Sequence, residues 1–314
     1  MLLFFHDLYA SIKDKNEVLK KLRFYSLQRF LVRNVANIVL FIYLKFYRNA
    51  NKFSLLPLQE KNCKLIVSLT SFPKRINKVW LVIETLLRQT SKPDLIILWL
   101  SKKQFSSLDV LPQKLLNMRS RGLRIILKED DLRSHKKYYY TLQEFPNDIM
   151  ITVDDDIFYP PNMIEELIKW HQEFPNTVIA RYGSKIKVSD KIIATYQEWE
   201  LNFEQTIPDF KVFFGSGGGT LFPPGSLPIE TLNKEVFMNL CLYADDIWLN
   251  TMCRLHNVKI FRTRTSQCSL LPILIKKDIY LYSKNISESL NDIQLKNIRK
   301  YYMSNRKIDP YLVF

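Results

Sequence analysis

Three consecutive aspartates close one of the most apolar stretches of the chain. Residues 148–153 have the composition of a buried strand, and Asp154, Asp155 and Asp156 follow directly. Adjacent carboxylates repel one another, so their place here needs compensation, which a divalent cation with oxygen ligands would supply. Because side chains alternate along a strand, we expect Asp154 and Asp156 to point one way and Asp155 the other. A solvated acidic turn is the alternative.

Glycine is concentrated in one short segment. The chain has 7 glycines in 314 residues, and five of them lie between positions 215 and 225. This indicates a backbone that approaches something closely or takes positive φ angles. The order is not GxGxxG and no Gly-Lys-Ser/Thr occurs, which argues against a dinucleotide site and a phosphate-binding P-loop. A tight β-bulge hairpin without a ligand is the alternative.

A second acidic pair, Asp245 and Asp246, precedes residues whose apolar positions recur at helical spacing from 247 to 255. The pair therefore stands at a helix N-terminus, where the helix dipole stabilises carboxylates. It is either a helix cap alone or a cap that also supplies a catalytic base.

The segments that must position these residues alternate between strands and helices from residue 64 onward. Apolar runs at 65–69, 95–100, 123–127 and 148–153 predict strands, with helical stretches between them. This order predicts an α/β fold with right-handed crossovers, a mostly parallel sheet and helices on both faces. Ligands in such folds bind beyond the carboxyl ends of the strands, where the aspartate run is expected.

Composition and charge set further limits. The chain is 47% hydrophobic and 25% charged, which is typical of a globular protein, and four cysteines without CxxC spacing predict reduced thiols. The net charge is +15, and the ends are the most basic parts, with ten Lys/Arg against four Asp/Glu in residues 1–60. We expect a basic helical N-terminal extension (1–60), a catalytic domain (61–275) and a basic helical C-terminal tail (276–314). The basic ends indicate an anionic partner or a solvated basic surface.

The N-terminal extension contains an apolar helical stripe. Val35, Ile38, Val39, Ile42 and Phe46 recur at helical spacing among lysines and arginines. The stripe either lies in a membrane interface or packs on the main domain. The longest unbroken apolar run is seven residues, where a spanning helix needs about 20. We therefore expect no segment that crosses a membrane and a cytoplasmic protein, at most peripheral at the inner face of the cytoplasmic membrane.

Four motifs in order resemble a known family. They are Thr-Ser-Phe-Pro-Lys-Arg at 70–75, Val-Asp-Asp-Asp at 153–156, Gly-Gly-Gly-Thr-Leu-Phe-Pro-Pro-Gly at 217–225 and Ala-Asp-Asp-Ile-Trp at 244–248. Together they resemble bacterial glycosyltransferases of the GT-A fold, most closely the family 2-related enzymes of capsule and O-antigen synthesis. The resemblance covers residues 62–270 and implies a GT-A-like, Rossmann-like sheet with helical extensions at both ends.

The resemblance also implies a site. Asp154 and Asp156 would hold Mn²⁺ or Mg²⁺ on the diphosphate of a nucleotide-sugar donor, a UDP-sugar in our reading. Asp246 would be the base of an inverting reaction, with Asp245 as the reserve candidate. Lys136 and Lys137 resemble a basic segment that contacts the diphosphate, with solvated lysines as the alternative. The donor-binding residues it implies are Thr70, Ser71, Phe72, Arg75, Lys137, Asp154, Asp155, Gly217, Gly218 and Gly219.

The leading hypothesis is thus a metal-dependent glycosyltransferase of surface-polysaccharide synthesis, acting on a glycan or polyprenyl-linked glycan acceptor and contacting anionic membrane peripherally. One alternative is a nucleotidyl- or phosphotransferase with a carboxylate metal site. Another is a basic membrane- or nucleic-acid-binding protein without catalysis. No nucleic-acid-binding signature occurs in the sequence, so we expect no nucleic-acid partner.

Overall fold

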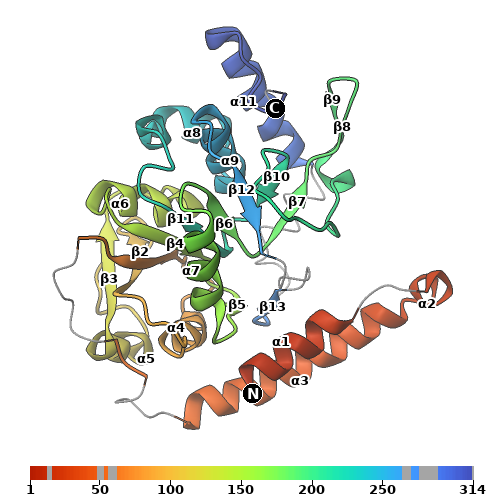
Figure 1. The fold of residues 1–314 in the computed structure, drawn as a ribbon. Helices are drawn as coiled ribbons and strands as arrows, with labels where there is room; N and C mark the ends of the chain where they lie inside the picture. The colour runs from red at the N-terminus through yellow and green to blue at the C-terminus, as the bar shows by residue number, and fades with distance from the viewer. Residues whose placement is uncertain (13–15, 48–52, 56–61, 264–269, 276–288, 313–314) are drawn as a thin grey trace.

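A computed structural model describes residues 1–12, 16–47, 53–55, 62–263, 270–275 and 289–312. Its centre is a seven-stranded sheet in the order β12-β6-β11-β4-β1-β2-β3 (Figure 1). All strands run parallel except β11, which is antiparallel to both of its neighbours. The bounds are β1 Leu65–Thr70, β2 Leu95–Ser101, β3 Leu123–Lys128, β4 Ile149–Val153, β6 Val178–Ala180, β11 Gly218–Phe222 and β12 Ile260–Arg262.

Two cores lie on opposite faces of this sheet because the side chains of each strand alternate. Val67 of β1 and Leu98 of β2 face one core, whereas Ile66 and Trp99 face the other. The first core is covered by α4 (Val79–Leu87), α5 (Gln113–Leu116) and α7 (Met163–Glu173). The second is covered by α6 (Lys136–Glu144), α8 (Lys234–Leu240), α9 (Asp245–Leu255) and α11 (Leu290–Arg306). The predicted α/β class, with a mostly parallel mixed sheet flanked by helices and helical ends, is confirmed.

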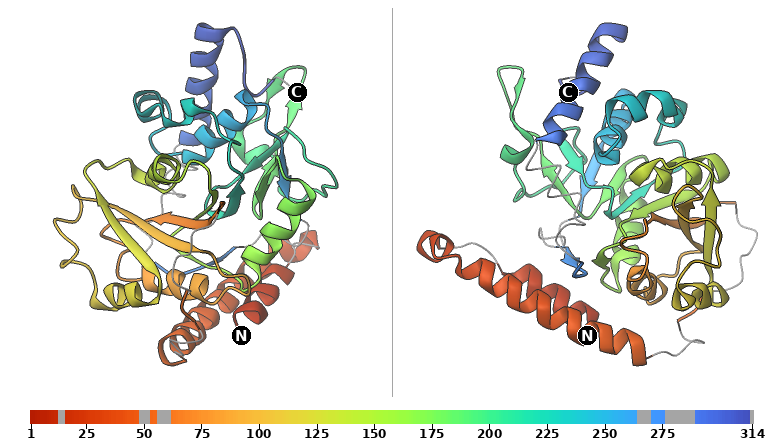
Figure 2. Two further views of the ribbon diagram at one scale, coloured as in Figure 1. Left: turned by 60° about the vertical axis from the view of Figure 1, so that its left-hand side comes forward. Right: turned by 180° about the vertical axis from the view of Figure 1, so that it is seen from behind.

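The remaining described elements surround the sheet (Figure 2). Three two-stranded sheets pair β5 with β13, β7 with β10 and β8 with β9. Their bounds are β5 Ile157–Phe158, β7 Gly183–Lys185, β8 Val188–Ser189, β9 Ile192–Ile193, β10 Val212–Phe214 and β13 Leu271–Pro272. Four 3₁₀ segments span Asn117–Arg121, Arg133–His135, Tyr196–Glu198 and Ile229–Leu232. The N-terminal helices are α1 Leu2–Ser11, α2 Glu17–Lys21 and α3 Phe24–Phe46.

The glycine segment is not the hairpin considered as an alternative. Gly218 begins β11, which inserts between β4 and β6 with a register shift between Gly218 and Thr220. The expected irregularity is present, but it belongs to a strand of the central sheet. Since β11 runs opposite to β4, the turn before β11 meets the end of β4.

The packing face of α3 differs from the predicted stripe. Ala36, Leu40 and Leu44 are fully buried, whereas Val35 and Ile38 are more than half exposed. Apolar residues occur nearly all round this helix, so their spacing alone did not select the packed face.

The run-length argument against a membrane-spanning segment does not hold for α3, while the expectation that no segment crosses a membrane stays a prediction. The 23 residues of α3 include an 18-residue window of mean hydropathy 1.3, enough for a spanning helix by length and composition alone. Polar residues such as Gln28 and Asn34 shorten the unbroken apolar run but lower the mean hydropathy of the window only slightly. Buried helices of globular proteins and signal sequences meet the same criterion.

The thiol prediction concerns four cysteines. Cys63, Cys241 and Cys253 are free. Cys268 lies outside the described residues.

Candidate active site

The aspartate run forms a turn beyond the end of β4. Asp154 Oδ1 lies 2.8 Å from Lys137 Nζ, while Arg75 Nη1 lies 2.6 Å from Asp155 Oδ1 and 3.0 Å from Asp156 Oδ2. The predicted alternation is therefore wrong: Asp155 and Asp156 share a partner and Asp154 turns elsewhere. The reason is that the strand ends at Val153, so strand geometry no longer governs the aspartates.

Asp155 ties this turn to the segment after β1. Ser71 Oγ donates a hydrogen bond to Asp155 Oδ2, and Arg75 binds the other oxygen of the same buried carboxylate. Thr70 donates to the Trp99 carbonyl of the neighbouring strand, and the Phe72 ring lies 5.3 Å from the Arg75 guanidinium. The predicted donor-binding segment and the aspartate turn are thus one hydrogen-bonded unit.

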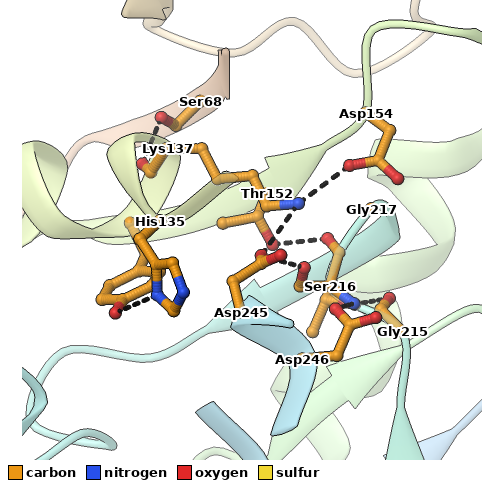
Figure 3. Close-up of polar contacts among 12 residues, drawn as sticks. Ser68, His135, Lys137, Thr152, Asp154, Gly215, Ser216, Gly217, Asp245 and Asp246 are labelled. Carbon is orange, nitrogen blue, oxygen red and sulfur yellow. Dashed lines mark hydrogen bonds and ion pairs between the residues drawn. The ribbon is translucent and has the colours of Figure 1, made fainter. Parts of the chain in front are cut away.

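Lys137 connects the two acidic groups (Figure 3). Its Nζ lies 2.8 Å from Asp154 Oδ1 and 3.0 Å from Asp245 Oδ2. Burial alone would lower the pKa of Lys137, but the carboxylates of Asp154, Asp245 and Asp246 outweigh it and raise that pKa. Lys136 is also buried and binds Asp131. The alternative of solvated lysines is therefore wrong, because both side chains turn inward from the first turn of α6.

Asp245 and Asp246 open α9, and their surroundings shift their pKa values in opposite directions. Burial would raise the pKa of Asp245, but Lys137 lowers it to about 2. Burial and the charge of Asp245 raise the pKa of Asp246 to about 7. Environments that push the pKa values of two acids apart define separate acid–base roles. Asp245 is ionised as a partner of Lys137, and Asp246 has the pKa range suited to a general base at neutral pH.

Ser216 holds both carboxylates, and sequence reasoning missed it. Its backbone N–H donates to Asp246 Oδ1 (2.7 Å) and its hydroxyl to Asp245 Oδ2 (2.7 Å). Its carbonyl accepts a hydrogen bond from Thr152 Oγ1 of β4. The available signal was its position between Gly215 and Gly217, inside the glycine-rich segment that the sequence already marks as a close approach of the backbone.

Gly217 leaves room for Asp154. A Cβ built at Gly217 would lie 1.8–2.3 Å from the carboxyl atoms of Asp154. Gly218 and Gly219 instead face side chains of the protein, Tyr182 and Met163, and Gly219 has a φ of +93°. The three glycines thus meet different demands, and of them Gly217 borders the acidic cluster.

Replacing Gly217 with alanine should displace Asp154 and abolish any metal-dependent binding at this turn. The added methyl group would overlap the carboxyl group, so either the turn or Asp154 must move. Gly225→Ala is the control, because no atom lies within 4 Å of a Cβ there and only the backbone strain of its φ of +72° is added. Isothermal titration with Mn²⁺ and a nucleoside diphosphate measures the difference. Equal affinity of both variants would contradict this account of Gly217.

The cluster has more negative than positive groups. Five carboxylates, those of Asp154–Asp156 and Asp245–Asp246, contact or surround two cationic groups, Arg75 and Lys137. Burial raises the pKa of Asp156 to about 7. Arg75 lowers this pKa, but the neighbouring carboxylates oppose that effect. A surplus of hard oxygen donors fits Mg²⁺ or Mn²⁺ chemically.

The geometry limits how such an ion would be held. Within the described ranges, no group of three or more His, Cys, Asp or Glu side chains is arranged to hold a metal ion. Mg²⁺ commonly binds one or two carboxylates and takes its other ligands from water and substrate phosphates. Asp154, whose side chain is 44% exposed, and Asp156 fit that partial donor set.

Comparisons with known proteins leave the family open. No protein-family model matches the chain, and no curated protein matches its sequence. Among solved structures, a likeness is found to the mannosyltransferase PcManGT from Pyrobaculum calidifontis in complex with GDP-Man and Mn²⁺. The identity is 10% and the TM-score 0.48, over 90% of this chain and 78% of that one. A 4-diphosphocytidyl-2C-methyl-D-erythritol synthase gives 12% and 0.40, over 70% and 97%. At these identities and scores neither likeness shows an activity for this chain, and its α/β class follows from the sheet.

Proposed function

We propose that the chain is a metal-dependent, inverting glycosyltransferase that moves a sugar from a nucleotide-sugar donor, a UDP-sugar, to a glycan or lipid-linked glycan acceptor in surface-polysaccharide synthesis. The observation that carries the proposal is the joined acidic cluster. Lys137 and Ser216 connect the aspartate turn after β4 to the acidic N-terminus of α9. Residues 61–275 form the catalytic unit in this proposal.

The reaction assigns a role to each part of the cluster. The acceptor oxygen attacks the anomeric carbon, the bond from that carbon to the diphosphate breaks, and Asp246 takes the acceptor proton. A single displacement inverts the anomeric centre. Asp154 and Asp156 would hold a Mn²⁺ or Mg²⁺ ion, which stabilises the negative charge on the leaving diphosphate. Arg75 and Ser71 keep the aspartate turn in place through Asp155.

A thermal-shift screen with Mn²⁺ and a panel of nucleoside diphosphates and nucleotide sugars tests the proposal. A ligand of the native state raises the melting temperature by mass action, so one nucleotide should do so only when metal is present. Asp156→Asn should lose that metal-dependent shift. Asp109→Asn, at an exposed carboxylate between β2 and α5, should keep the metal-dependent shift.

The products separate the proposal from its enzymatic alternative. A glycosyltransferase releases a nucleoside diphosphate from the donor, whereas a nucleotidyltransferase releases pyrophosphate. Release of pyrophosphate would replace the proposal with nucleotidyl transfer. If the folded protein shows no metal-dependent thermal shift and releases neither nucleoside diphosphate nor pyrophosphate, the proposal that it is an enzyme of either kind is wrong.

A further inference from the structure

The first 47 residues carry most of the exposed apolar side chains. Of the 25 large apolar side chains that are exposed in the described residues, 16 lie there. Nine of them are on α3, and we call this set the apolar face of α3. It consists of Phe24, Leu27, Phe30, Leu31, Val35, Ile38, Phe41, Ile42 and Phe46. Globular proteins rarely expose apolar patches of this extent without a partner.

The apolar face lies opposite the packed face, and the polar residues Gln28, Asn34 and Lys45 share its arc. At about 100° per residue, its nine residues fall within an arc of about 160°, directly across the helix from Ala36, Leu40 and Leu44. It extends over 23 residues, about 33 Å along the helix axis. Figures 1 and 2 show α3 beside α1 on the outer side of the molecule, with nothing described beyond them. Leu3, Phe4 and Leu8 of α1 and Met1, which precedes it, add exposed apolar side chains.

The charge on α3 itself has one sign, with Arg29, Arg33 and Lys45 and no Asp or Glu, whereas α1 carries Asp7. The described residues 18–47 contain six Lys/Arg and no Asp or Glu. Lys45 Nζ lies 5.9 Å from the centroid of the Phe41 ring and 5.1 Å from that of Phe46, and the Arg33 guanidinium lies 5.8 Å from the Phe30 ring. Basic side chains that lie over apolar surface can keep their charged ends at the level of lipid headgroups.

We propose that α1 and α3 lie flat in the interface of an anionic lipid bilayer, with the apolar face of α3 toward the acyl chains. Charge complementarity selects this occupant. A second copy of the chain, related by two-fold symmetry, would bring the same basic surface against itself. Anionic headgroups would supply the opposite charge to Arg33 and Lys45, which lie near rings of the apolar face.

Contacts with the body favour a helix that lies in the interface over one that spans the bilayer. Asn37 donates to the Pro272 carbonyl (3.0 Å) and accepts from the Leu274 N–H (2.8 Å), and Arg88 donates to the Tyr47 carbonyl just after α3. A spanning orientation would have to break these hydrogen bonds and expose the buried residues of α3. The observed docking leaves only the apolar face available to lipid.

The same contacts fix the candidate site relative to the bilayer. Between the two residues bound by Asn37, Ile273 donates its N–H to the Asp156 carbonyl (2.7 Å). From α1, His6 hydrogen-bonds the Phe158 carbonyl, two residues after Asp156. Lipid binding at α1 and α3 therefore holds the aspartate turn at a constant height above the membrane, whatever reaction occurs there.

Vesicle co-sedimentation of the full chain tests the proposal. We expect binding to vesicles of phosphatidylcholine with phosphatidylglycerol, weakened by salt, and much less binding to phosphatidylcholine alone. Leu31→Gln/Val35→Gln/Ile38→Gln should lower the partition coefficient by about tenfold or more, because three side chains no longer enter the apolar layer. The matched control is Ile192→Gln/Ile207→Gln/Ile229→Gln, three exposed isoleucines elsewhere, which should bind as the wild type does.

Several outcomes would overturn the proposal. Equal binding of the two triple variants, each with a wild-type melting temperature, would show that the apolar face does not enter lipid. A dimer in sedimentation velocity that the α3 variant alone dissociates, without vesicle binding by the wild type, would assign the face to a second copy. Resistance to carbonate extraction would show that α3 spans the bilayer. None of these readouts depends on catalysis, so the proposed function can fail independently.

Discussion

Asp246→Asn is expected to lower the rate of sugar transfer by about 10²–10⁴-fold, the usual contribution of a general base. Asparagine can still accept the hydrogen bond from the Ser216 N–H, so the turn should persist, but it cannot take a proton from the acceptor. Release of nucleoside diphosphate in the presence of acceptor measures the rate. The metal-dependent thermal shift should remain, because donor binding does not need the proton acceptor.

Asp245→Asn separates a positioning role from a catalytic one. This change removes the carboxylate that binds Lys137 and the Ser216 hydroxyl, so thermal stability should fall together with activity. Asp246→Asn should lower activity without lowering stability. Near-wild-type transfer by the Asp246 variant would exclude it as the base, and full loss with Asp245→Asn at unchanged stability would transfer the assignment to Asp245.

The raised pKa of Asp246 also predicts a pH dependence. Transfer by the wild type should rise with pH through about 7, where the Asp246 carboxyl loses its proton. For stability, its folded pKa of about 7 lies above the ordinary 3.8, so between these values the native state holds a proton that the unfolded chain has lost. The contribution of Asp246 to stability is therefore present at low pH and is lost as pH rises through that window.

Comparison with Asp246→Asn isolates this contribution. We subtract the free energy of unfolding of the wild type from that of the variant, both measured without divalent cations. This difference should increase by up to about 1.4 kcal/mol for each pH unit between about pH 4 and 7. His6 and His135, whose pKa values burial lowers to about 4, act in the opposite direction in both proteins and cancel in the difference. A difference that is constant with pH would contradict the raised pKa.

Lys137→Met should destabilise the protein by about 3–5 kcal/mol, the typical cost of leaving a buried charge without its partner. Asp245, nearly buried, would lose its cation, and Asp154 would lose the contact that orients it. Methionine keeps the length and the apolar stem of lysine, so the loss reports the charge. Denaturant unfolding measures the change, and transfer activity should disappear with it.

Two further variants make the Lys137 result specific. Lys128→Met removes a partly exposed ion pair with Glu144 and should cost about 1 kcal/mol or less. Adding Asp245→Asn to Lys137→Met should recover part of the lost stability, since the uncompensated carboxylate is then absent. If Lys137→Met unfolds like Lys128→Met, the buried bridge does not stabilise the fold.

The first four strands could be predicted from the sequence because each is a short apolar run that ends in polar residues. The position of the aspartates beyond the last of these strands followed from the same pattern. The directions of Asp154 and Asp156 did not, because they depend on where β4 stops, and a pattern places strand ends only to within a few residues. The inward turn of Lys137 depends on Asp245, 108 residues later in the chain.

The structure of the glycine segment and the packed face of α3 were harder to predict from the sequence for a second reason. The strand β11 exists because β4 and β6 pair with its two edges, and no local pattern contains that information. In α3, the choice between Leu40 and Ile38 as the buried side chain depends on the shape of the body against which the helix docks.

The insertion of β11, antiparallel to its neighbours, also determines when the acidic cluster can assemble during folding. The strands β1 to β4 are consecutive in the chain and can pair as they emerge during synthesis, so the aspartate turn and α6 can form early. Ser216 and Asp245 join them only when β11 inserts between β4 and β6, through contacts that span more than 60 residues. Contacts of such long range form slowly. A nascent chain that ends after β4 therefore has the acidic turn but neither the glycine turn nor Asp245 and Asp246, so the joined acidic cluster forms only once β11 is in place.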